Sequence, residues 1–410
     1  MIRDFFRGFA ALFAVHPRLA VFPLLAVATS GFGQTFYLSV FGEELRAAFN
    51  LSHTMYGGLY SGATLTGALL LLRFGSLVDT WSLGRAVNLA VALLAAGCLL
   101  IGLAPAAWLL FVGLVLIRFG GQGFVAHLGM TTAARYFSAH RGKAVALAAL
   151  GIPLGEAVLP AAAVFLMSKG DWRWPWLAAS LILVLLILPL LRTLCRQPPP
   201  LSDSRHEGEA VQHQFTRAEA LRDRGFYFLL PAVLATPFVA TAVLFHQSAV
   251  ATARGWSLEL LAAAFVAFAL GHFLTLMVAG QLVDRIGSGR ALPLALLPMF
   301  LGMLLLAVSA APWIPFFYLT MLGCSIGLAT TAGGTIWADR YGVLHLGAIR
   351  SLVHSAVITA TAVAPVLAGV ILDSGLGVPA LALGMAAFSL ASAALALAAP
   401  APATQVHPSG

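Results

Sequence analysis

Long apolar stretches separated by short polar intervals make up most of the chain. Twelve of them reach roughly 20 residues, the length that spans a hydrocarbon core about 30 Å thick. Because lipid offers no partners to backbone amides and carbonyls, each stretch is expected to be helical. The expected spans are 19–42, 54–78, 83–104, 106–134, 142–168, 172–195, 225–253, 258–282, 290–310, 312–336, 346–372 and 377–399.

One long polar interval, residues 196–224, divides these spans into two groups of six. Three prolines near its start end the sixth span, because proline cannot continue a helical hydrogen-bond ladder. Thr216 and Glu219 have the spacing of a capping box and predict a short helix within the interval. We therefore expect an amino-terminal half, 19–195, and a carboxy-terminal half, 225–399, joined by a cytoplasmic linker.

The two ends of the chain lie outside the expected spans. Residues 1–18 are charged and rich in phenylalanine, and no small-residue cleavage site follows them. This pattern predicts an amphipathic cytoplasmic segment instead of a cleaved signal peptide. Residues 400–410 are expected to form a cytoplasmic tail.

Charged residues are few and unevenly distributed. Hydrophobic residues are 60% of the chain, charged residues 9%, and the mean hydropathy is +0.94. With the amino terminus inside, eighteen of the 23 Lys and Arg fall on cytoplasmic segments, four fall outside and Arg118 falls within a span. The positive-inside rule therefore predicts a multi-pass protein of the inner (plasma) membrane with both termini cytoplasmic. The net charge of +8 reports on this topology and requires no nucleic-acid partner.

Residues typical of enzymes and cofactor sites do not cluster in this sequence. Cys98, Cys195 and Cys324 lie in or beside spans, with neither metal-ligand spacing nor a disulfide pairing. The chain has no phosphate-binding loop, and the histidines within spans are scattered over four of them. We therefore expect no metal, no cofactor and no enzymatic activity.

A single ungapped offset of 205 residues relates the two halves. Gly75–Asp79 and Gly84–Ala86 correspond to Gly280–Asp284 and Gly289–Ala291. The same offset carries Trp108 onto Trp313, Arg135-Tyr136 onto Arg340-Tyr341, His140 onto His345, Gly142 onto Gly347 and Pro160 onto Pro365. In an apolar chain, a parallel duplication of six-helix halves is a known architecture of transporters.

The repeated loop resembles the hallmark of the major facilitator superfamily, Gly-x-Leu-x-Asp-Arg-x-Gly-Arg. The second copy, Gly280–Arg290, fits this form, whereas the first has Thr80 in place of the arginine. The resemblance covers essentially the whole chain and implies an all-α integral membrane protein of twelve transmembrane helices in two pseudo-symmetric six-helix halves. It also implies an inner gate, formed by Asp79, Arg85, Asp284, Arg285 and Arg290.

Within the superfamily, the first half looks most like the monocarboxylate and oxalate–formate branch. The likeness is carried by Arg135–Ala144, by Gly151–Gly155 and Pro160 of the fifth span, and by Asp171–Arg173 before the sixth. It implies transport of a small organic anion such as a monocarboxylate. The chain departs from the branch at its substrate-pairing cations, having no lysine in its first or eleventh span and no arginine within its eighth.

Arg118 and Glu156 are the main candidates for a central site. At 1.5 Å per residue, Arg118 lies roughly 18 Å from the outer end of its span and Glu156 roughly 21 Å from the inner end of the next. Charges at this depth cost at least ~2.5–3.5 kcal/mol each, so we expect the two to pair. Gln122 follows Arg118 by one turn and would share its face.

Two interpretations of this pair stay open. In the functional one, Arg118 binds the carboxylate of a substrate and Glu156 exchanges a proton. In the structural one, the pair only holds the amino-terminal half together. Weaker candidates are the histidines within spans, of which His272 is favoured by its depth, because imidazole titrates near neutrality. The histidines and the other polar cavity candidates are His127, His246, His272, His354, Gln34, Tyr37, Thr330 and Thr331.

These features together predict a monomeric secondary transporter that moves a small organic solute by alternating access, with a proton as coupling ion. Proton-driven efflux of drugs or metabolites is the alternative, because Arg118–Gly123 is close to the antiporter motif Arg-x-x-Gln-Gly, although it is one residue longer. An alternative from another class is a non-transporting membrane sensor of the same fold. A sensor would more readily dispense with the repeated gate and the central charges.

Overall fold

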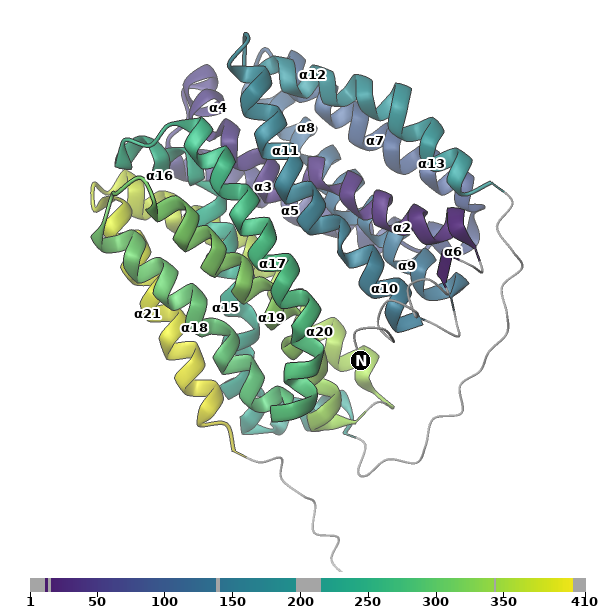
Figure 1. Ribbon diagram of the computed structural model, residues 1–410, viewed down its shortest axis with the longest axis vertical. Helices are drawn as coiled ribbons and strands as arrows, with labels where there is room; N and C mark the ends of the chain where they lie inside the picture. The colour runs from purple at the N-terminus through teal and green to yellow at the C-terminus, as the bar shows by residue number, and fades with distance from the viewer. Residues whose placement is uncertain (1–11, 14–15, 138–140, 197–214, 343, 401–410) are drawn as a thin grey trace, which may run out of the picture.

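The computed structural model describes residues 12–13, 16–137, 141–196, 215–342 and 344–400. Within these ranges all of the regular elements are helices (Figure 1). Three expected segments fall wholly or largely outside the described residues. They are the amphipathic segment 1–18, the linker before Phe215 and the tail after Pro400.

The first half begins with a helix that is broken near its middle. Its two pieces, Pro17–Gly33 and Thr35–Phe49, meet at an angle of 43°. The first half consists of α2 (Pro17–Thr29), η1 (Ser30–Gly33), α3 (Thr35–Leu38), η2 (Ser39–Phe41), α4 (Gly42–Phe49), α5 (His53–Phe74), α6 (Leu77–Thr80), α7 (Leu83–Leu103), α8 (Ala107–Ile117), η3 (Arg118–Val125), α9 (Ala126–Tyr136), α10 (Arg141–Ala149), α11 (Gly151–Met167), α12 (Arg173–Ile182), η5 (Leu183–Ile187) and α13 (Leu188–Leu194).

The second half is built from longer, less interrupted helices. Its elements are α14 (Arg217–Arg222), α15 (Arg224–Phe245), α16 (Gln247–Arg254), α17 (Leu258–Ile286), α18 (Ser288–Val308), α19 (Ile314–Tyr341), α20 (Leu346–Asp373) and α21 (Gly377–Leu397). Over the described chain, 11 helices are long and apolar enough to cross a membrane, and the bent pair supplies a twelfth. The expected twelve-helix membrane fold is confirmed.

The helix boundaries repeat with the offset found in the sequence. Helix α7 begins at residue 83 and ends at 103, and α18 begins at 288 and ends at 308, so both ends differ by 205. Helices α5 and α17 begin at 53 and 258, and α10 and α20 begin at 141 and 346, again 205 apart. The two halves are therefore structural repeats as well as sequence repeats.

A capping box begins the described part of the linker, next to the second half. The side chain of Thr216 accepts a hydrogen bond from the Glu219 amide, and the Glu219 carboxylate accepts one from the Thr216 amide at 2.7 Å. The predicted helix starts there and ends at Arg222, directly before Asp223, which caps the next helix. Arg340 Nε and Tyr341 Oη each lie 2.7 Å from the Asp223 carboxylate, which fixes the start of α15 to the end of α19.

The two halves are joined where α5 begins and α20 ends, an end of the molecule that we call the closed end. The carboxylate of Asp373 accepts hydrogen bonds from the amides of His53 at 3.0 Å and Thr54 at 2.8 Å. The Glu43 amide donates to Ser248 Oγ at 3.1 Å, and these two residues are themselves 205 positions apart. A contact between equivalent positions of a duplication lies near its pseudo-two-fold axis.

Close packing continues from the closed end toward the middle of the bundle. The ring of Phe245 lies 4.4 Å from that of Tyr56 and 4.3 Å from that of Tyr60. Ser61 Oγ donates to the carbonyl oxygen of Ala362. At the opposite end, the linker end, α9 and α10 diverge from α19 and α20 (Figure 1).

Candidate functional site

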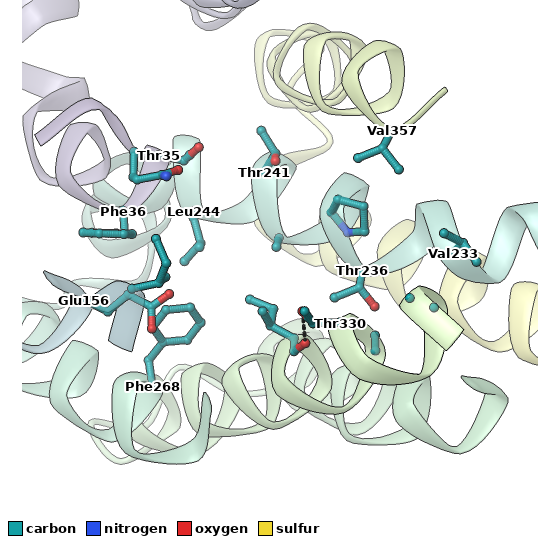
Figure 2. A pocket seen from close by; sticks show the side chains of 18 of the residues that line it. Thr35, Phe36, Glu156, Val233, Thr236, Thr241, Leu244, Phe268, Thr330 and Val357 are labelled. Atoms are coloured by element: carbon teal, nitrogen blue, oxygen red, sulfur yellow. Dashed lines mark hydrogen bonds between the residues drawn. The ribbon is translucent and has the colours of Figure 1, made fainter. Parts of the chain in front are cut away.

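A cavity of about 490 Å³ lies between the two halves. The broken first span, α11, α15, α17, α19 and α20 contribute its walls (Figure 2). Its lining residues are Gln34, Thr35, Phe36, Ile152, Glu156, Val233, Thr236, Pro237, Ala240, Thr241, Leu244, Phe268, Ile326, Ala329, Thr330, Gly333, Gly334, His354 and Val357. Its volume is within the range typical of sites for small organic ligands.

The break in the first span places polar groups in this cavity. Gly33 comes just before the break and packs directly on the fourth span, where a Cβ atom would lie only 2.1 Å from the carbonyl oxygen of Ile117. Only glycine fits at such a distance. Gln34 then adopts an extended conformation with ψ of 159°, so that it and Thr35 line the cavity.

Arg118 stabilises the break and does not line the cavity. Its Nη1 donates to the carbonyl oxygen of Gly33 at 2.9 Å, and its Nε donates to Thr64 Oγ1 at 3.1 Å. Its guanidinium carbon lies 4.7 Å from the centre of the Tyr60 ring, and the residue is only 3% exposed. A carbonyl freed by a helix break inside a membrane needs a donor, and Arg118 supplies it.

The expected ion pair between Arg118 and Glu156 is therefore wrong. Depth along a helix does not decide the partner of either residue, because the direction of each side chain depends on local geometry. Arg118 begins the π-helical segment η3, which changes the helical register through Val125. Gln122, the other expected site residue on this segment, does not line the cavity either.

Glu156 pairs with His272 instead. Oε2 of Glu156 lies 2.9 Å from Nδ1 of His272, and the two residues are 3% and 5% exposed. Glu156 belongs to α11 of the first half and His272 to α17 of the second, so the pair joins the two repeats. Glu156 also lines the cavity, between Phe36 and Phe268 in the view of Figure 2.

Hydroxyl groups line the cavity beside this carboxylate. Thr330 Oγ1 donates to the carbonyl oxygen of Ile326 at 2.7 Å. Thr236 is 4% exposed, and its Oγ1 is buried without a hydrogen-bond partner in the described structure. Sequence reasoning missed Thr236 and Thr241, although a threonine directly before Pro237 in an apolar span is a recognisable signal.

The other expected cavity residues divide into two groups. Gln34, Thr330 and His354 line the cavity as expected. Tyr37, His246, Thr331 and His127 do not line it.

The two buried members of the second group have structural partners. Tyr37 Oη donates to the carbonyl oxygen of Pro175, and its ring packs 5.0 Å from that of Trp176. His246 lies at the closed end, with Nε2 2.8 Å from the carbonyl oxygen of Pro365.

The expected gate residues lie at the linker end. Arg85, Asp284, Arg285 and Arg290 are exposed, and Asp79 belongs to the short helix α6. In the described part of the chain, the four exposed residues form no ion pair with one another.

Comparison with known proteins identifies the class. The family model of the Major Facilitator Superfamily matches residues 24–261 and 240–409. The chain belongs to this superfamily of membrane transporters. No curated protein sequence matches the chain significantly.

Solved structures of two transporters share the fold. A bacterial homologue of the human lysosomal transporter Spinster, in an inward-facing and unoccupied conformation, superposes with a TM-score of 0.63 at 17% identity. That comparison covers 93% of this chain and 95% of the other. A mutant of the nucleoside transporter NupG gives a TM-score of 0.71 at 10% identity, covering 93% and 99%. At such identities the likeness shows the fold alone.

Proposed function

We propose that the protein is a proton-coupled secondary transporter that moves a small organic solute by alternating access. The observation that carries the proposal is the Glu156–His272 pair, which joins the two halves at the wall of the cavity between them. Membership of the superfamily supports transport and not catalysis.

The chemistry of the pair supports proton coupling. A carboxylate and an imidazole held 2.9 Å apart in a buried site can share a proton. When the halves rock apart, Glu156 and His272 lose each other as partners. Each group must then be neutral or find a new partner, because an isolated buried charge is costly. Proton binding is thereby coupled to the movement of the halves.

The arrangement of the two halves supports a proposal about the side of the membrane to which the cavity opens. The halves touch at the closed end and diverge at the linker end (Figure 1). Basic residues gather on segments at the linker end, among them Arg85, Arg285 and Arg290. By the positive-inside rule we propose that this end faces the cytoplasm of a plasma membrane and that the cavity opens inward.

The charged groups around the cavity bear on which solutes it accepts. The monocarboxylate prediction depends on Arg118, whose Nη1 and Nε donate to Gly33 and Thr64 and which does not line the cavity. An apolar cavity with a single carboxylate supports the alternative, proton-driven efflux of drugs or metabolites, as the second candidate function. Both candidates use the same pair for the proton.

Proton movement in proteoliposomes tests the function across a panel of candidate solutes. Wild-type protein is reconstituted with an entrapped pH-sensitive dye and challenged with small carboxylates, amines and nucleosides. We expect at least one solute to drive proton movement in the wild type and in Glu259→Gln, which removes an exposed carboxylate of α17. In Glu156→Gln the signal should vanish. Solute uptake with no proton movement in the wild type would contradict proton coupling.

A further inference from the structure

The charge of the cavity wall distinguishes among possible solutes. Glu156 is the sole acidic residue in the described lining, and none of the lining residues is Lys or Arg. Arg118 is buried against Tyr60 and Gly33. An organic anion at the centre of the cavity would therefore meet a carboxylate and no permanent cation.

One arginine, Arg350, lies close to the cavity. Arg350 is exposed near the start of α20, one turn before the lining residue His354. Its guanidinium donates to the carbonyl oxygen of Gly334, which also lines the cavity. Arg350 is thus held at the edge of the site on the linker side, with one donor already used.

Aromatic rings flank the single carboxylate. Phe36 and Phe268 are 5% and 1% exposed, and their side chains lie on either side of Glu156 in Figure 2. The faces of aromatic rings attract organic cations, most strongly where water is excluded. Leu244, Ile326 and Val357 add apolar surface for the body of a ligand. The unpartnered hydroxyl of Thr236 offers one further hydrogen bond.

We propose that this cavity binds a lipophilic organic cation, with its charge against the Glu156 carboxylate and its apolar body between the rings and aliphatic walls. The inference rests on the proposed transport function and specifies its substrate class. Cation and proton then compete for Glu156, whose Oε2 lies 2.9 Å from His272 Nδ1. A carboxylate that holds a proton, or that is paired with a protonated His272, no longer attracts the ligand. His354 is the other titratable side chain of the described lining. Cation binding should accordingly weaken as the pH falls.

Two ions of nearly the same shape and opposite charge test the proposal. Tetraphenylphosphonium and tetraphenylborate are compared by equilibrium dialysis against purified protein in detergent, with protein-free detergent as the blank. We expect the cation to bind at least about tenfold more tightly than the anion, which corresponds to about 1.4 kcal/mol. Glu156→Gln should remove most of this preference, whereas Arg350→Gln should leave it unchanged.

The outcomes separate this inference from the proposed function. The cation proposal would be overturned if tetraphenylborate bound more tightly than tetraphenylphosphonium. It would also be overturned if benzoate bound more tightly than the cation and Arg350→Gln abolished that binding. Either result would leave proton coupling intact. If tetraphenylphosphonium bound preferentially but its binding did not change with pH, proton coupling would be contradicted. The proposed substrate class, an organic cation, would remain intact. The comparison of the two ions on the wild type holds even if the Glu156 variant folds poorly.

Discussion

Nδ1 of His272 lies 2.9 Å from Oε2 of Glu156, and the two halves of the duplication differ at this level of the bundle. The offset of 205 places Gly67 at the position of His272 and Gly323 at the position of Arg118. A Cβ atom added at Gly67 would lie 3.3 Å from Arg118 Cβ, and one added at Gly323 would lie 3.0 Å from the His272 amide nitrogen. In each half a glycine therefore packs against the polar residue that the other half lacks.

Arg118 is predicted to be a structural residue. Arg118→Lys keeps the charge but cannot reproduce both the two hydrogen bonds and the stacking on Tyr60. We expect a loss of about 1–3 kcal/mol in the free energy of unfolding, from one or two hydrogen bonds to a charged group. Thermal unfolding in detergent measures it. Thr64→Val, which removes one acceptor, should cost less. Unchanged stability with lost ligand affinity would restore Arg118 to the binding site.

The contact of Asp373 with α5 is predicted to hold the closed end shut. Asp373→Asn weakens a carboxylate cap on the His53 and Thr54 amides, at a cost of about 0.5–2 kcal/mol. The equilibrium should shift toward opening at this end. Faster thiol labelling of Ser61→Cys, with the native cysteines replaced, would report the shift.

A matched control exists for the closed-end variant. Asp171→Asn alters another carboxylate, which accepts locally from the Arg173 amide within the first half. It should leave labelling of Ser61→Cys unchanged. Equal labelling in the Asp373 and Asp171 variants would mean that the Asp373 cap does not control opening.

The gate residues are predicted to pair in the other conformation. Asp284 and its neighbours are exposed here, where the helices diverge at the linker end. Asp79→Asn or Asp284→Asn should therefore favour the state open at the linker end and slow transport, while the protein stays folded. Transport rates and accessibility labelling measure both effects. If both variants behaved as the wild type, Asp79 and Asp284 would serve only to set the membrane topology.

The Asp223–Arg340 pair predicts a pH dependence of stability. Burial opposes ionisation of Asp223, but hydrogen bonds from Arg340, Tyr341 and Gly225 outweigh it and lower the pKa of this carboxyl. Because the pKa of Asp223 is lower in the folded state, the ionised carboxylate stabilises the protein at a pH above its unfolded-state pKa, about 3.9. This stabilisation is lost as the pH falls through the folded-state pKa. Below about pH 4, unfolding temperatures of the wild type should converge toward those of Asp223→Asn. A constant difference from pH 7 downward would contradict the assignment.

The fold could be predicted from the sequence because it depends on quantities that a sequence contains directly. Span lengths follow from bilayer thickness, and the 205-residue offset fixes how the halves correspond. The ends of α7 and α18 differ by that offset at both termini. The main departure is the first span, which bends at Gln34, and the nearby glycines only hint at such a break.

The site could be predicted only in part, because side-chain direction is set by packing. The depths of Arg118 and Glu156 follow from helix rise, but their partners depend on the break at Gly33 and on the π-helical segment that starts at Arg118. His272 is favoured by the sequence for its depth alone. Its approach to Glu156 results from the packing of α11 against α17, which the order of residues does not reveal.

Proton-driven accumulation and solute exchange, compared in the same Glu156→Gln proteoliposomes, test the coupling most directly. Gln keeps the size of the side chain and a hydrogen-bonding oxygen toward His272, but it cannot ionise. With a solute that drives proton movement in the wild type, we predict that a pH gradient no longer accumulates it in Glu156→Gln. Exchange of labelled for unlabelled solute should continue when the solute concentration is raised to offset the weaker binding in this variant. Accumulation at the wild-type rate in this variant would show that the Glu156–His272 pair does not carry the coupling proton.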